Sequence, residues 1–206
     1  MNINLSDLSA SILENLSHVD HVKSADLPNI DLYMDQVTTF MEQQLTSTKR
    51  HEADKILTKT MINNYVKSQL MPAPDKKKYT KEHLLLMLFI YYFKNVLSIT
   101  DIHSLLAPIC ERYFGKNEGI RLEDIYNEIS LLEESETDHI REDILRQYQE
   151  SQKLFSSDEL PSEEQDNLRL FSFLSMLCFD VCIKKSLIEA ILDARETGEP
   201  ANADEG

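Results

Sequence analysis

Lysine, asparagine and threonine side chains between residues 58 and 79 are the groups in this chain best suited to binding a polyanion. In residues 58–70 the polar side chains and the apolar ones that can pack each recur at steps of three and four residues, which predicts an amphipathic helix. Lysine ammonium groups reach phosphates or guanine, and asparagine amides can read adenine edges. A short turn and a run of three lysines follow. The residues predict a DNA-binding surface formed by Lys59, Thr60, Asn63, Asn64, Lys67, Lys76, Lys77, Lys78 and Tyr79.

An ordinary solvated surface helix is the competing interpretation of residues 58–70. The segment that follows it favours DNA, because a turn bounded by Pro72 and Pro74 leads directly into Lys76–Lys78. Such a basic wing places cations beside the groove, where the phosphates lie. We therefore expect helix 58–70 to enter the major groove and Lys76–Lys78 with Tyr79 to brace the DNA backbone.

The charge of the chain is divided unevenly along its length. The formal net charge of −15 argues against nucleic acid when taken alone. Residues 1–100, however, hold eleven basic and eleven acidic side chains, whereas residues 101–206 hold ten and twenty-five. Within residues 46–81, nine basic side chains face three acidic ones. This asymmetry predicts a polyanion-binding N-terminal half and an acidic half with another role.

Helical periodicity dominates the remaining sequence, and only four glycines interrupt it. Proline lacks an amide donor and disfavours helix in the residue before it, so residues 71–74 must leave the helix. Short wing strands are expected around Ala73 and Tyr79. The expected helices span residues 32–45, 58–70, 80–95, 98–106 (ending near Pro108), 120–134, 138–154 and 167–195.

Two apolar segments predict how these helices pack. Leu84, Leu85, Leu88, Phe89 and Tyr92 recur at helical spacing and are expected to pack on Ile62, Val66 and Phe40. Residues 168–183 are apolar on more than one face, so this helix is expected to be central or at an interface. A large exposed apolar patch is a liability, and a second subunit is one way to cover it. We expect a homodimer through residues 160–195; the alternative is a compact bundle that covers this helix within one chain.

Other kinds of chemistry find little support in the residues. No phosphate-binding glycine loop, dinucleotide fingerprint or Ser/His/Asp signature is present, so we expect no enzymatic activity and no cofactor. Cys178 and Cys182 share a helix face but lack two further ligands, so buried structural thiols are expected rather than a metal site. Three sparse cysteines and the lack of a signal sequence favour a cytoplasmic protein. The longest apolar run, residues 84–93, is about half the length of a membrane span.

A resemblance to the MerR-type winged helix-turn-helix domain rests on residues 27–108. Tyr65, Leu70, Pro72 and Tyr79 stand where that family has its second-helix tyrosine, its leucine–proline passage and the tyrosine after the wing. Residues 97–102 resemble the helix that follows. Asn63-Asn64 replace an arginine usual in the family, and the wing carries lysines instead of arginine. The chain also resembles an uncharacterised bacterial family of MerR-like proteins with an additional helical C-terminal half.

The resemblance implies an all-α fold, with at most a tiny two-stranded wing, in which a winged domain precedes a C-terminal helical bundle. The expected divisions are an amphipathic arm (1–26), the winged helix-turn-helix domain (27–110), an acidic helical domain (111–195) and a disordered tail (196–206). The implied function is a DNA-binding transcriptional regulator. The alternative is a helical interaction protein or regulatory adaptor that keeps the winged fold without binding DNA.

Overall fold

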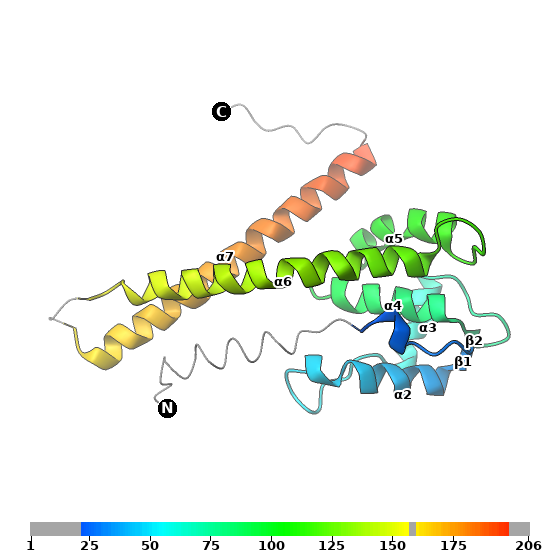
Figure 1. Cartoon of the computed structure of the whole chain (residues 1–206), viewed down its shortest axis with the longest axis horizontal. Helices are drawn as coiled ribbons and strands as arrows, with labels where there is room; N and C mark the ends of the chain where they lie inside the picture. The colour runs from blue at the N-terminus through cyan, green and yellow to red at the C-terminus, as the bar shows by residue number, and fades with distance from the viewer. Residues whose placement is uncertain (1–21, 157–159, 198–206) are drawn as a thin grey trace. The chain divides into compact units, whose positions relative to one another are not determined.

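The chain is mostly helical, with one two-stranded sheet among the residues that the structure describes (Figure 1). The structure is a computed structural model, and it describes residues 22–156 and 160–197. Its elements are the short 3-10 helices Ser24–Asp26 (η1) and Thr46–Thr48 (η2), strands Leu32–Tyr33 (β1) and Lys78–Tyr79 (β2), and helices Met34–Gln44 (α2), Lys59–Lys67 (α3), Lys81–Phe93 (α4), Ile99–Tyr113 (α5), Leu122–Gln152 (α6) and Ser162–Thr197 (α7). The predicted fold class, mostly helix with a very small sheet, is confirmed.

Two compact units divide the described chain between Leu132 and Glu133, inside α6. We call residues 22–132 the winged unit and the described residues from Glu133 onwards the C-terminal unit. Most of the predicted N-terminal arm and of the predicted disordered tail lies outside the described residues. The tail's first two residues, Glu196 and Thr197, form the end of α7.

Helix α4 forms the centre of the winged unit. Every side chain from His83 to Tyr91 is buried, and Leu84, Leu85 and Leu88 have no exposed surface. Polar groups cap its start: the backbone N–H of Thr80 donates to Nδ1 of His83, at 3.1 Å. The predicted helix over residues 80–95 is therefore present, two residues shorter at its C-terminus. Ile62 of α3 is also fully buried, whereas Val66 and Phe40 are only partly covered.

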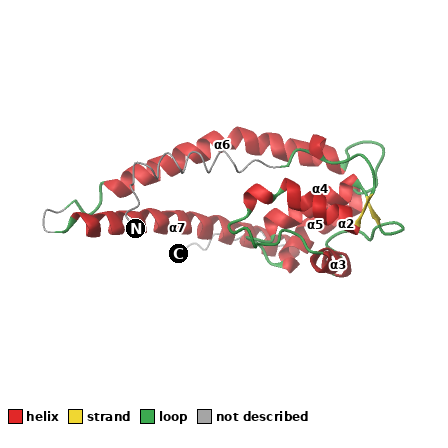
Figure 2. Ribbon diagram, turned by 90° about the horizontal axis from the view of Figure 1, so that it is seen from below, coloured by secondary structure: helices red, strands yellow, loops and turns green. Residues whose placement is uncertain are grey.

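The small sheet joins the segment before α2 to the segment before α4, as the yellow arrows in Figure 2 show. Leu32 pairs with Tyr79 and Tyr33 pairs with Lys78, in antiparallel register. A strand was expected near Tyr79, but its partner was expected near Ala73. Pro72 and Pro74 explain the difference, because neither can donate a hydrogen bond to a strand ladder.

Helix α3 ends three residues earlier than the predicted Leu70. Ser68 is its C-cap, and Gln69 turns into the left-handed region with φ of 59°. The N–H of Leu70 donates to the carbonyl of Tyr65 at 2.9 Å, and the N–H of Gln69 donates to the carbonyl of Val66 at 3.1 Å. These two bonds form a Schellman cap, which leads the chain into the wing.

The left-handed position of Gln69 predicts a stabilising substitution. A side chain bearing Cβ is strained at this φ, and glycine is not. Gln69→Gly should raise the free energy of unfolding by about 1 kcal/mol, measured by urea unfolding of the full chain. Gln69→Ala, which retains Cβ, should bring no gain; an equal gain from alanine would refute the explanation.

Other predicted helix boundaries were also wrong. Helix α5 continues through Pro108 to Tyr113. The proline removes only one backbone hydrogen bond, and the burial of Ile102 and Leu106 stabilises the preceding turns enough to outweigh that loss. The two helices expected at 120–134 and 138–154 form the single helix α6. No glycine or proline interrupts residues 122–152, and the hydroxyl of Thr137 donates to the carbonyl of Glu133 within the helix.

The first turns of α6 belong to the winged unit, which therefore extends beyond the predicted boundary at residue 110. The buried hydroxyl of Tyr126 donates to the carbonyl of Val22 at 2.6 Å. The rings of Tyr126 and Phe89 meet edge to face, with centroids 5.2 Å apart. Lys81 and Glu123 form a partly buried ion pair at 2.8 Å. These contacts join the start of α6 to α4 and the first described residue of the unit to α6.

In the C-terminal unit, the second half of α6 contacts α7. The rings of Tyr148 and Phe173 meet edge to face with centroids 5.4 Å apart, and the amide of Gln147 donates to Asp180. Cys178 and Cys182, expected to be buried, are exposed on α7. The periodicity that predicted the helix did not show which of its several apolar faces would be covered.

Candidate nucleic-acid interface

The polar face of α3 is exposed as predicted. Ile62 and Tyr65 are buried against the unit, while Lys59, Thr60, Asn63, Asn64 and Lys67 all lie at the surface. Thr58 caps the helix, its hydroxyl accepting from the N–H of Met61 at 3.2 Å. The helix thus presents two amides, one hydroxyl and two ammonium groups on one side.

The lysine turn, residues Asp75 to Lys78, forms the tip of the wing. The N–H of Lys78 donates to the carbonyl of Asp75 at 2.8 Å, closing a tight turn. Lys76 and Lys77 occupy its centre with φ of 46° and 65°. Both central residues of such a turn normally are glycine, asparagine or aspartate, because positive φ strains other residues. The chain therefore holds two exposed lysines in a conformation that lysine disfavours, a kind of local strain that often accompanies function.

The start of α2 brings the lysine turn and α3 together. The ammonium of Lys59, at the start of α3, pairs with the carboxylate of Asp35. The ammonium of Lys78 lies over the ring of Tyr33, 5.5 Å from its centroid. Tyr33 and Asp35 are two residues apart, so the two cationic elements meet at one end of α2. Both side chains of the Lys59–Asp35 pair are largely exposed, so the ion pair contributes little free energy. A phosphate that bound Lys59 in place of Asp35 would therefore lose little by breaking the pair.

Four of the candidate lysines carry charge that no carboxylate compensates. Lys67, Lys76, Lys77 and Lys78 are exposed and form no ion pair with any other described residue. Lys49 and Lys81, by contrast, are paired with Glu42 and Glu123. These cations lie on the exposed side of α3 and on the lysine turn.

Tyr79 does not belong to this exposed set. It is 3% exposed, pairs with Leu32 in the sheet, and meets the ring of His83 edge to face at 5.5 Å. We therefore remove Tyr79 from the candidate DNA contacts. Its ring anchors the wing to α4, while the neighbouring Lys78 faces outwards.

His83 links the wing, the start of α4 and the end of α5. Its ring lies between those of Tyr79 and Phe114, whose centroids are 5.5 Å and 4.8 Å away. Burial lowers the pKa of His83, against smaller opposing effects from the carbonyls of Pro72 and Ala73 and from the Asp31 carboxylate. The neutral ring accepts the Thr80 N–H through Nδ1, which a protonated ring cannot do.

The lowered pKa of His83 predicts loss of stability in mild acid. The unfolded chain protonates His83 more readily than the folded chain does. The contribution of the neutral His83 ring to the free energy of unfolding is therefore present above pH about 6.5 and is lost as the pH falls below that value. His83→Gln keeps a side-chain acceptor for the cap but cannot titrate. The free energy of unfolding of the original chain should therefore fall more steeply than that of the variant between pH 7.5 and 5.5. Parallel curves, or an NMR titration of His83 with a pKa above 6.5, would refute this assignment.

A groove beside α3 contains a residue that the sequence gave no reason to include. The groove has a volume of about 630 Å³ and is lined by Met61, Asn64, Tyr65, Lys67, Ser68, Lys94 and Ile99. Burial lowers the pKa of Lys94, whose ammonium donates to the carbonyl of Ile56 at 3.1 Å and lies 4.6 Å from the Tyr91 ring centroid. Lys94 comes at the end of an apolar helix, so only the tertiary structure places it beside Lys67 and Asn64.

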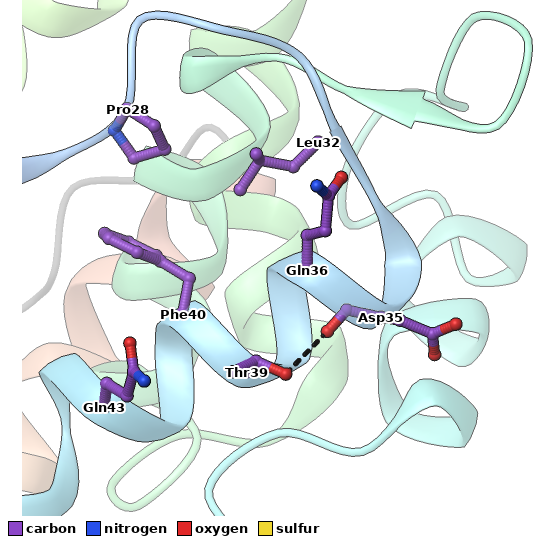
Figure 3. Close-up of a pocket in the computed structure, with 7 residues that line it drawn as sticks. All are labelled: Pro28, Leu32, Asp35, Gln36, Thr39, Phe40 and Gln43. Atoms are coloured by element: carbon purple, nitrogen blue, oxygen red, sulfur yellow. Dashed lines mark hydrogen bonds between the residues drawn. The ribbon is translucent and has the colours of Figure 1, made fainter.

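A second groove, of about 420 Å³, follows the outer side of α2 (Figure 3). Its lining residues are Pro28, Leu32, Asp35, Gln36, Thr39, Phe40 and Gln43. Apolar and amide groups dominate this lining and its one ionisable group is a carboxylate, so the groove is unsuited to phosphate. The hydroxyl of Thr39 is directed back to the carbonyl of Asp35, at 2.9 Å.

Metal binding and membrane insertion find no support in the described part of the chain. Within residues 22–156 and 160–197, no three His, Cys, Asp or Glu side chains gather as metal ligands would. None of the helices in those ranges combines the length and the apolar character needed to cross a membrane. The half-buried thiol of Cys110 is also poorly reactive, because burial raises its pKa to about 11.

Comparison with known proteins identifies one family. The model of a domain of unknown function, DUF1836, matches residues 22–129, just over half of the chain. The match begins and ends close to the bounds of the winged unit. No curated protein and no solved structure matches the chain.

Proposed function

The chain belongs to the DUF1836 family of domains of unknown function, and we propose that its winged unit binds double-stranded DNA as part of a transcriptional regulator. The observation that carries the proposal is the meeting of two cationic elements at the start of α2. Asp35 pairs with Lys59 of α3, and Tyr33 lies beneath Lys78 of the lysine turn. An exposed polar helix and a basic turn fixed side by side match the way in which winged helix-turn-helix proteins grip DNA.

Each element has a distinct part in this proposal. Asn63 and Asn64 contact base edges in the major groove, where an amide can bond adenine in two places. Lys59 and Lys67 contact the phosphates that border the groove, and Lys76–Lys78 contact the neighbouring backbone. The resemblance to MerR-type domains supports the same arrangement. Lys94, half-buried beside Lys67, adds positive charge near the far end of α3.

A salt titration of DNA binding tests the proposal directly. Five lysine–phosphate contacts should give a plot of log affinity against log salt concentration with a slope of about −4 to −5. The measurement is fluorescence anisotropy of the full chain with labelled duplexes from a genomic library. The paired variant Asn63→Ala/Asn64→Ala should retain the slope and lose the preference among sequences. Absence of binding to every duplex at low salt would refute the proposal.

A second candidate function is a helical adaptor that binds another protein, and one observation favours it. Helix α7 exposes large apolar side chains, among them Phe171, Phe179 and Ile183, each more than 60% exposed. A surface of this kind commonly marks a site of protein association. The adaptor would retain its function after the lysines of the winged unit are neutralised, whereas the DNA-binding regulator would not.

A further inference from the structure

One face of α7 contacts α6, while large apolar side chains on its other faces are exposed. The stripe that contacts α6 includes Phe173, which meets Tyr148, and Asp180, which bonds Gln147. These two positions are seven residues apart, the repeat of a helix that packs along a coiled-coil seam. Side chains at the same spacing along the adjacent face of α7 form a second stripe, which is a candidate seam.

The second stripe repeats at alternating steps of three and four residues, and all of its members except the partly covered Lys185 are exposed. Its members are Phe171, Leu174, Cys178, Val181, Lys185 and Ile188. Phe171, Leu174, Val181 and Ile188 are 69%, 50%, 59% and 37% exposed, and Cys178 is exposed too. This spacing fits the inward-facing positions of a coiled coil, so the partner it requires is another helix with a matching stripe.

We propose that this stripe binds the same stripe of a second copy of the chain in antiparallel orientation, forming a homodimer through α7. The steps 3, 4, 3, 4, 3 read the same in both directions, so the stripe is self-complementary about a two-fold axis between Cys178 and Val181. Phe171 then faces Ile188 of the other copy, and Leu174 faces Lys185 of the other copy. The inference does not depend on whether the winged unit binds DNA.

Charge determines the orientation. In a parallel pair, the ammonium of Lys185 would face the same ammonium of the other copy in the middle of an apolar seam. In the antiparallel pair it lies beside Leu174 and keeps its ion pair with Glu189 on its own helix. An isolated lysine within a seam fixes register because wrong alignments bring like charges together or leave one charge unpaired.

Substitutions at matched positions test the surface. Light scattering of the full chain at micromolar concentration should give twice the chain mass of 23.9 kDa. Phe171→Glu with Val181→Glu should halve that mass, since four carboxylates would enter the seam opposite uncharged side chains. Phe179→Glu with Ile183→Glu, at equally exposed positions outside the stripe, should leave it unchanged. Circular dichroism should show full helix content in both variants. A monomeric original chain, or equal effects of the two pairs, would overturn the proposal.

Engineered disulfides test the orientation. In a chain whose three native cysteines are replaced by alanine, Leu174→Cys with Lys185→Cys should link two copies on oxidation. Either substitution alone should not, because in the antiparallel pair the two positions face each other and not themselves. Rapid linking by the single variants would show a parallel pair and overturn the orientation. Protection of the stripe from hydrogen exchange in a monomer would show that another part of the chain covers it, and would overturn the dimer.

Discussion

Leu88→Ala should lower the free energy of unfolding by about 2–5 kcal/mol. Leu88 lies at the centre of α4, has no exposed surface, and is enclosed within a run of nine buried residues. Removing its three outer carbons loses the free energy gained when these carbons are transferred from water into the core. It also leaves a cavity that the close-packed surroundings cannot fill. This loss is a large share of the total stability of a domain.

Urea unfolding of the full chain, followed by circular dichroism, measures this loss. Leu131→Ala is the matched control, because Leu131 is 60% exposed near the end of the same unit and its truncation should change stability by less than about 0.5 kcal/mol. A loss under 1 kcal/mol for Leu88→Ala would mean that α4 is not the core of the winged unit.

The sequence predicted α4 and α3 because their apolar residues follow a helical period over three turns or more. A run such as residues 84–93 needs burial on all sides, and the fold places it at the centre. The amphipathic pattern of residues 58–67 likewise fixed which side of α3 is exposed. For these elements, local periodicity and tertiary packing favour the same structure.

Two-residue strands have no period to detect, and this is why β1 was missed. Leu32 was assigned to the following helix, and nothing near it indicates that its partner is Tyr79, forty-seven residues away. The same limit applies to Tyr79 itself. An aromatic residue next to three lysines suggests a nucleic-acid contact, but pairing in the strand turns its ring inwards and leaves Lys78 exposed.

The junction at the start of α2 also required the tertiary structure. Asp35 and Tyr33 precede Lys59 and Lys78 by more than twenty residues, and neither short-range spacing nor composition links them. The predicted lysines are thus confirmed as exposed, while the residues that hold them in place came only from the fold. The exposed thiols of α7 have a similar cause, since a helix that is apolar all round does not reveal which face is covered.

Replacing the two central residues of the lysine turn should change stability and DNA binding in opposite directions. Lys76→Asn with Lys77→Gly supplies residues that adopt positive φ readily, in place of two that do so with strain. The free energy of unfolding should therefore rise by about 1–2 kcal/mol. The same change removes two phosphate contacts, so the slope of log affinity against log salt should become less negative by about 1.8. Affinity at 0.1 M salt should fall by roughly 10-fold to 100-fold.

These opposite signs separate a lost contact from a damaged fold, because a misfolded variant would lose both stability and binding. Arg112→Gln with Lys116→Asn is the control for net charge, since it removes two exposed cations from the same unit at positions outside α3 and the lysine turn. This control should reduce affinity by no more than about threefold, through the long-range field alone. If the control weakens binding as much as the turn variant, the lysine turn has no particular role. If the turn variant is more stable and binds DNA as well as the original chain, the strained lysines do not contact phosphate, and the adaptor becomes the better proposal.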